Sequence, residues 1–110
     1  MSSTNRLAWE TLRSIDSATL TGSYQALGTP LAYPSFICKI VNNSSVLVTI
    51  SINGSTDIDV APANSYWLYD EGRVISVANA VALPKGVQFY VKGSAGTGSI
   101  YLVSQYIIQG

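Results

Sequence analysis

The chain has 110 residues, six of them basic and six acidic, with no histidine, one cysteine and 47% hydrophobic residues. Its length fits one domain around one core, and its formal net charge of zero gives no general positive field for phosphates, so we expect no nucleic-acid partner. The absence of histidine excludes Ser-His-Asp and Cys-His catalysis, and a single cysteine excludes both an intramolecular disulfide framework and a cysteine-based zinc cluster.

The N-terminal part of the chain is predicted to be extended. Residues 7–15 alternate as a strand does, and this is the structure we expect. Ala8, Leu12 and Ile15 also fit a short helical stripe, which is the alternative. Residues 17–23 and 28–34 are rich in turn-forming residues, and Pro30 and Pro34 fix two backbone angles.

Two alternating runs and a hairpin signal follow. Apolar side chains recur at every second position of residues 35–41, which predicts a strand. The Asn-Asn-Ser-Ser segment at residues 42–45 predicts a turn, and residues 46–52 alternate again as a second strand. Asn53-Gly54 is the strongest short hairpin signal, so we expect a tight turn there.

The rest of the chain continues as short strands separated by turns. The chain returns through residues 57–60, which Pro62 ends. Further strands are predicted at residues 66–69, 73–78, 87–92 and 99–108. The last of them would span roughly 33 Å, and its end at Tyr106–Ile108 is apolar on both faces. We therefore expect another segment to cover that end.

These patterns predict an all-β fold, an antiparallel β-sandwich of jelly-roll or immunoglobulin-like type. Residues 1–34 would form an extended N-terminal arm with a first strand, and residues 35–110 the sandwich core, within a single domain. We expect the arm to lie over the sandwich or over a neighbouring molecule.

Few side chains are candidates for chemistry. Cys38 lies in mid-strand, where burial suppresses the thiolate, so we expect a core residue rather than a nucleophile. Asp57 and Asp59 would project from one face of a strand about 7 Å apart, which suits an inverting glycosidase pair or a hard cation. Carboxylates also protect strand edges, and we favour that explanation.

The Gly93–Gly98 segment is expected to be a flexible connector, since a strand follows it and phosphate loops precede a helix. No catalytic, cofactor-binding or metal-binding residue is predicted.

The segment from Tyr66 to Tyr69 is the richest in aromatic residues. Alternation puts Tyr66 and Leu68 on one face and Trp67 and Tyr69 on the other, so one pair belongs to the core and the other packs against the arm or a partner. Exposed aromatic rings suit a protein interface or a glycan platform. The predicted interface consists of Trp9, Leu12, Trp67, Tyr69, Tyr106 and Ile108.

A set of short motifs extends from about residue 12 to residue 103. The motifs are Arg13-Ser14, Gly22-Ser23-Tyr24, Leu27-Gly28-Thr29-Pro30-Leu31, Lys39-Ile40-Val41-Asn42-Asn43, Asp57, Pro62-Ala63, Tyr69-Asp70, Leu83-Pro84-Lys85-Gly86 and Tyr90-Val91-Lys92-Gly93. Together they resemble a group of small β-structured virion proteins of tailed bacteriophages. The resemblance implies a structural component present in many copies at the neck, collar or capsid surface of the particle. It supplies no catalytic or binding-site pattern.

Composition also favours assembly. Charged residues make up 11% of the chain, less than half of the roughly 25% typical of globular proteins, and such a surface promotes self-association. We expect a non-enzymatic structural subunit of a bacteriophage virion, made in the host cytoplasm, which binds copies of itself and other virion proteins. No apolar run is long enough to predict a membrane partner.

The alternative is a carbohydrate-binding β-sandwich module on the virion surface. Trp67, Tyr69 and Tyr101 would be its stacking platforms, and Asp57 or Asp59 would bond to sugar hydroxyls.

Overall fold

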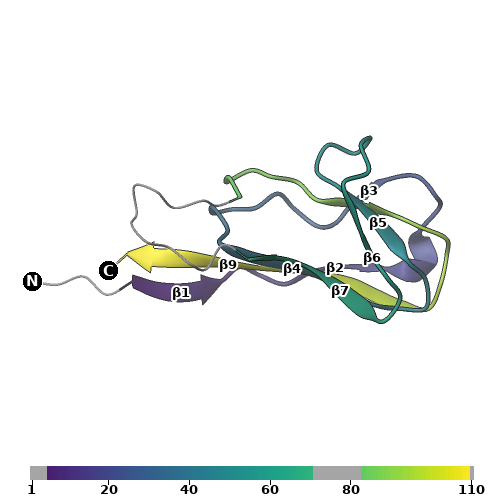
Figure 1. Ribbon diagram of the computed structural model, residues 1–110, viewed down its shortest axis with the longest axis horizontal. Coiled ribbons are helices and arrows are strands. Elements are labelled where there is room, and N and C mark those ends of the chain that lie inside the picture. The colour runs from purple at the N-terminus through teal and green to yellow at the C-terminus, as the bar shows by residue number, and fades with distance from the viewer. Residues whose placement is uncertain (1–4, 71–82, 110) are drawn as a thin grey trace, which may run out of the picture.

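Nine β-strands lie in the part of the chain that the structure, a computed structural model, describes: residues 5–70 and 83–109 (Figure 1). They are β1 (Asn5–Trp9), β2 (Arg13–Asp16), β3 (Gln25–Ala26), β4 (Ile37–Ser44), β5 (Val48–Ser51), β6 (Asp59–Ala61), β7 (Ser65–Asp70), β8 (Tyr90–Lys92) and β9 (Gly98–Gln109). A 3-10 helix, η1 (Ser17–Thr19), follows β2. The predicted all-β sandwich is confirmed.

The strands form two antiparallel sheets that pack face to face. The first, the β9 sheet, has the order β1-β9-β4-β7, with β2 also paired to β9, and the second, the β8 sheet, has the order β3-β8-β5-β6. The chain pairs as one long hairpin that is rolled into two sheets. Its nested strand pairs are, from the ends of the hairpin to its tip, β2/β9, β3/β8, β4/β7 and β5/β6. This is the jelly-roll arrangement. An immunoglobulin sandwich orders its strands differently.

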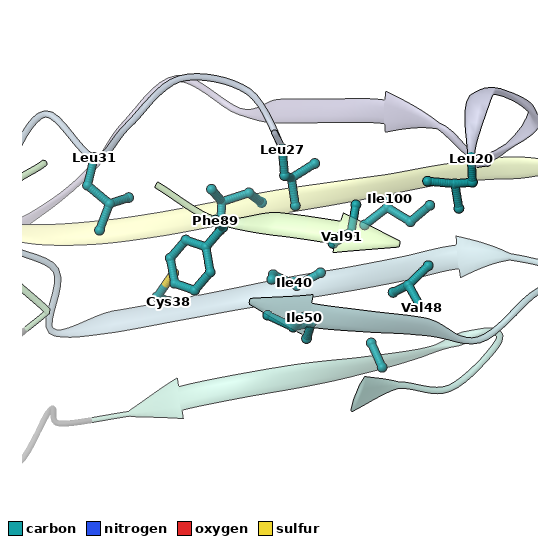
Figure 2. Close-up of a cluster of buried hydrophobic side chains, with 12 residues drawn as sticks. Leu20, Leu27, Leu31, Cys38, Ile40, Val48, Ile50, Phe89, Val91 and Ile100 are labelled. Atoms are coloured by element: carbon teal, nitrogen blue, oxygen red, sulfur yellow. The ribbon is translucent and has the colours of Figure 1, made fainter. Parts of the chain in front are cut away.

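The core lies between the sheets and is filled from alternate positions of the strands (Figure 2). Cys38 and Ile40 face it from β4, and Ile100 and Leu102 from β9, so the predicted alternation of these strands is confirmed. Burying each large aliphatic side chain contributes about 1.5–3 kcal/mol. The buried apolar residues are Leu20, Leu27, Leu31, Cys38, Ile40, Val48, Ile50, Ala61, Phe89, Val91, Ile100 and Leu102.

The N-terminal segment is built into both sheets. β1 and β2 confirm a strand over residues 7–15, although it is interrupted at residues 10–12. Further along, Leu20, Leu27 and Leu31 are buried in the core, and β3 forms one edge of the β8 sheet. From β2 onward the segment is therefore part of the sandwich.

The predicted turn at residues 42–45 is wrong, because β4 continues to Ser44. β9 is long enough to pair with this extension, with Asn42 opposite Ile100. The fully buried Asn42 amide donates hydrogen bonds of 2.7, 2.9 and 3.2 Å to the carbonyl oxygens of Val46, Ala61 and Pro62. These partners stabilise a polar side chain inside the sandwich.

The tight hairpin predicted at Asn53-Gly54 is also wrong. β5 and β6 do pair, but residues 52–58 connect them. The Oδ1 atom of Asn53 accepts hydrogen bonds from the N–H groups of Ser55 and Thr56 at 2.9 and 2.8 Å, which folds a wider loop. This local use of an asparagine side chain competes with a two-residue turn.

The remaining strand predictions differ mainly in their bounds. Those at residues 66–69 and 99–108 are confirmed by β7 and β9. The strand predicted at residues 87–92 is reduced to β8, although Phe89 just before it is buried. The strand predicted at residues 73–78 lies outside the described residues.

Candidate functional site

β1 and the end of β9 form a two-stranded ribbon that projects from the sandwich (Figure 1). β4 pairs with β9 only as far as Gln105, whereas β1 pairs with Gln105–Gln109. Within the described ranges, β1 is thus the one strand paired with the last four residues of β9. The sequence predicts that another segment covers the apolar end of the last strand. β1 pairs along the edge of that end, and Tyr106, Ile107 and Ile108 are half-buried. We call β1 and Gln105–Gln109 the ribbon.

A groove of about 590 Å³ lies beside the base of the ribbon. Trp9 and Leu12 border it with 61% and 56% of their surfaces exposed. Tyr106 and Tyr33 stack in its wall, with ring centroids 3.9 Å apart. The groove therefore brings together three of the six predicted interface residues: Trp9, Leu12 and Tyr106.

A buried ion pair shapes the floor of this groove. The Nη2 atom of Arg13 lies 2.8 Å from the Oε1 atom of Glu10, and the two side chains are only 8% and 3% exposed. The Arg13 guanidinium also donates hydrogen bonds of 2.8 Å to the carbonyl oxygens of Thr29 and Pro30. Arg13 thus fastens residues 29–30 to the start of β2.

The Glu10 carboxylate fastens the next two residues. It accepts hydrogen bonds from the backbone N–H groups of Ala32 and Tyr33 at 3.0 and 3.1 Å. Gly28 has a φ of +69°, and a Cβ atom there would lie 2.6 Å from the Arg13 side chain. Only glycine accommodates both the backbone angle and the close approach.

These contacts also set the ionisation of the site. Burial raises the pKa of the Glu10 carboxyl, but the hydrogen bonds from Ala32, Arg13 and Tyr33 and the charge of Arg13 outweigh it, so this pKa lies below its ordinary value of 4.5. Burial also raises the pKa of Tyr106, and the neighbouring Tyr33 adds to the increase. At neutral pH Glu10 is therefore a carboxylate, and it holds Ala32 and Tyr33 against the segment between β1 and β2.

The structure places the other predicted interface residues elsewhere. Trp67 and Tyr69 pack against the core, Trp67 edge-on to Phe89 with ring centroids 5.6 Å apart. Their choice as outward-facing interface or stacking residues is therefore wrong, because β7 turns this face of its alternation inward. Ile108 lies in the ribbon opposite Arg6 and is half-buried.

The other face of β7 points outward. Tyr66 and Leu68 are 59% and 47% exposed, and they line a shallow groove of about 480 Å³ on the outer surface of the β9 sheet. The register puts Val41 between Tyr66 and Tyr101 in one row across β7, β4 and β9. The groove is lined by Ile37, Lys39, Val41, Tyr66, Leu68, Asp70, Val103 and Gln105.

Asp57 does not project from a strand alongside Asp59, as the sequence predicts. Asp57 precedes β6 and binds Tyr24, whose hydroxyl donates to it, and Lys92, whose Nζ atom lies 3.1 Å away. Asp59 instead accepts a hydrogen bond of 2.7 Å from the Nε1 atom of Trp67, which joins β6 of one sheet to β7 of the other. The two carboxylates thus hold separate structural contacts.

Cys38 is fully buried, and burial raises the pKa of its thiol to about 12. The thiol is therefore protonated at neutral pH, as its position in mid-strand predicts. Among residues 5–70 and 83–109, no group of three or more histidine, cysteine, aspartate or glutamate side chains is arranged to hold a metal ion. The same residues contain no helix that could span a membrane.

The sequence did not indicate Glu10 or Tyr33 as site residues, and it gave Tyr66 only as one of two alternatives. An acidic residue three positions before Arg13 is a signal for an ion pair, but only the folded loop shows that the pair is buried. Tyr33 lies between two prolines in a segment without periodicity, so nothing local indicates that it stacks on Tyr106. For Tyr66, alternation indicated the two possible faces and left open which one is inward.

A comparison with models of known protein families gives no match for this chain, and a comparison with curated protein sequences finds no relative.

Proposed function

We propose that the protein is a non-enzymatic structural subunit that assembles in many copies in the particle of a tailed bacteriophage, at the neck, collar or capsid surface. The observation that carries the proposal is the ribbon with its adjoining groove, where Trp9 and Leu12 leave more than half of their surfaces in water. Exposed large apolar side chains beside a projecting strand pair are typical of a surface that another protein covers.

Further features support a role without catalysis. The chain has no histidine, the Cys38 thiol is buried, and Asp57 and Asp59 are engaged in separate structural contacts. The jelly roll occurs in viral capsid proteins and also in lectins, so the fold alone does not decide between assembly and sugar binding.

The proposal is tested by weighing the purified chain in solution and by proteomics of purified particles. We expect a concentration-dependent oligomer, and we expect the double variant Trp9→Ser/Leu12→Ser to lose it. The matched control is Leu47→Ser/Ile52→Ser, which removes two apolar side chains of similar exposure, 49% and 47%, away from the groove. A monomeric wild-type chain that is absent from particles would overturn the proposal.

The second candidate is carbohydrate binding on the outer surface of the β9 sheet. The row of Tyr66, Val41 and Tyr101 offers two tyrosines whose strands lie two spacings, about 10 Å, apart, with Lys39 and Gln105 nearby as polar partners. This moves the platform from Trp67 and Tyr69 to the opposite face of β7. A glycan array should detect binding that Tyr66→Ala abolishes and Tyr33→Ala leaves intact.

A further inference from the structure

We infer that β1 is the contact through which two copies of the chain pair, edge to edge and antiparallel, about a two-fold axis at Leu7. The inference rests on the proposed assembly function and names the partner of the ribbon.

The register shows which backbone groups of β1 face outward. The N–H group of Glu10 donates to the carbonyl oxygen of Ser104 on β9 at 3.0 Å. Adjacent residues of an antiparallel strand direct their backbone groups to opposite sides, so Ala8 and Arg6 also direct theirs toward β9. The N–H and C=O groups of Asn5, Leu7 and Trp9 therefore lie on the open edge, where no described strand pairs with them.

The outward backbone groups of β1 are complementary to the same groups of a second copy. In an antiparallel pair with Leu7 opposite Leu7 of the second copy, Asn5 lies opposite Trp9, and all three outward residues of each strand meet outward residues of the other. A shift of this register in either direction leaves part of the set without partners. The single charge on β1, Arg6, then lies opposite the small Ala8 rather than opposite a second arginine.

β1 is also an edge well suited to such pairing. β3 and β6 are edges of only two and three residues, and the edge strands β6 and β7 are already joined by the Asp59–Trp67 hydrogen bond. β1 has five residues and no proline, which are the features of an edge that pairs readily with another strand. Leu7, 51% exposed, would meet its copy beside Ile107 on the same face. With zero net charge, two copies do not repel each other strongly.

The test uses a proline at position 7. The N–H group of Leu7 faces away from β9, so Leu7→Pro keeps the β1–β9 hydrogen bonds and removes one donor per copy from the contact. We expect self-association to weaken about tenfold or more, measured by analytical ultracentrifugation. Leu7→Ala, which keeps the N–H group, is the matched control and should weaken it less.

Cysteine cross-linking tests the register itself. Leu7→Cys puts two thiols on directly opposite residues with Cα atoms about 5.5 Å apart, within disulfide range. Ala8→Cys is the control, because its two copies would lie about 8 Å apart, beyond that range. The native Cys38 is buried and does not compete. Under mild oxidation, Leu7→Cys should form a covalent dimer and Ala8→Cys should stay monomeric.

The outcomes separate this inference from the proposed function. If the wild-type chain forms an oligomer but Leu7→Pro associates as well as Leu7→Ala does, or both cysteine variants cross-link equally, the β1 contact is wrong and assembly uses another surface. If Leu7→Pro reduces particle incorporation without changing self-association, β1 binds a different virion protein and the inference is likewise overturned. If the wild-type chain stays monomeric at high concentration and is absent from particles, both fail.

Discussion

Arg13 joins the first strand of the sandwich to a loop more than fifteen residues away. Its guanidinium contacts Thr29 and Pro30, and its partner Glu10 contacts Ala32 and Tyr33. An ion pair this deeply buried costs much of its Coulomb energy in desolvation. The ion pair instead fixes the position of the loop. Both side chains also form hydrogen bonds with backbone groups of residues 29–33, and these bonds require one arrangement of that loop.

Removing one partner of the pair should destabilise the fold strongly. Arg13→Met leaves the Glu10 carboxylate buried without its counter-ion, and we expect a loss of about 3–5 kcal/mol in the free energy of unfolding. The double variant Arg13→Met/Glu10→Gln should recover part of that loss, because no charge is then buried. Urea unfolding of the three chains measures both effects. Equal stability of the single and double variants would contradict the explanation.

The same carboxylate predicts an acid dependence. The pKa of Glu10 is lower in the folded chain than its ordinary 4.5, so its contribution is complete above the unfolded value and is lost as the pH falls through the folded one. Glu10→Gln should therefore be less stable than the wild type at neutral pH, and the difference should shrink below pH of about 4.5. Urea unfolding midpoints of the wild type and of Glu10→Gln, measured across this pH range, test whether the difference in stability shrinks as the pH falls.

A glycine at the start of β9 is predicted to be irreplaceable. Gly98 has a φ of +109°, and a Cβ atom there would lie 2.1 Å from the carbonyl oxygen of Asn43. Gly22 has a similar φ of +84° but open space around it. Gly98→Ala should therefore cost clearly more stability than Gly22→Ala, which carries only the backbone strain of roughly 1 kcal/mol. Thermal unfolding of the two variants distinguishes a clash from strain alone.

At the scale of elements, local patterns predicted the strands better than they predicted the turns. Alternation alone indicated β4, β7 and β9 correctly. Residues 42–45 look like a turn, yet residues 42–44 belong to β4 because β9 offers them partners about fifty-five residues later. The sequence could not show this, since the pairing is non-local. The Gly93–Gly98 connector does precede a strand as predicted, and hydrogen bonds from Gly22 to Gly93 and from Gly96 to Ser17 tie it to the N-terminal segment.

The loop between β5 and β6 is held against β8 by Asp57. Burial, the hydrogen bond to Asp57 and the charge of Asp57 together raise the pKa of Tyr24 to about 12. Asp57→Asn removes the charge, so we expect the Tyr24 pKa to fall toward its ordinary value of 10. Amide hydrogen exchange in residues 52–58 should speed up in the same variant. An NMR titration of the Tyr24 ring checks the first effect, with Asp59→Asn as the control.

At the scale of the whole molecule, the jelly roll joins the earliest strands to the latest ones. β2 and β9 pair although more than eighty residues separate them, and β3 and β8 pair across more than sixty. The candidate site depends on the same long-range pairing. Tyr33 and Tyr106 stack only when the N-terminal segment and β9 have come together. This explains why single residues such as Trp9 and Tyr106 could be predicted as surface candidates while the groove they share could not.

Such a topology predicts slow folding. Loops of this length have to close before their strand pairs are formed, so we expect refolding in milliseconds to seconds rather than microseconds. Stopped-flow fluorescence can follow it, because Trp67 is packed against the core whereas Trp9 stays exposed. Single-phase refolding in microseconds would contradict the nested pairing.

The register of the ribbon has a practical consequence for anyone who labels this protein. Because Asn5 lies directly opposite Gln109, a polypeptide attached ahead of the former or behind the latter emerges from one and the same tip. A fluorescent label at Asn5 or at Gln109 would therefore report on the same tip of the ribbon. A short linker that joins those two residues would allow a circular permutation. The new termini would then lie in a distant loop, such as residues 52–58.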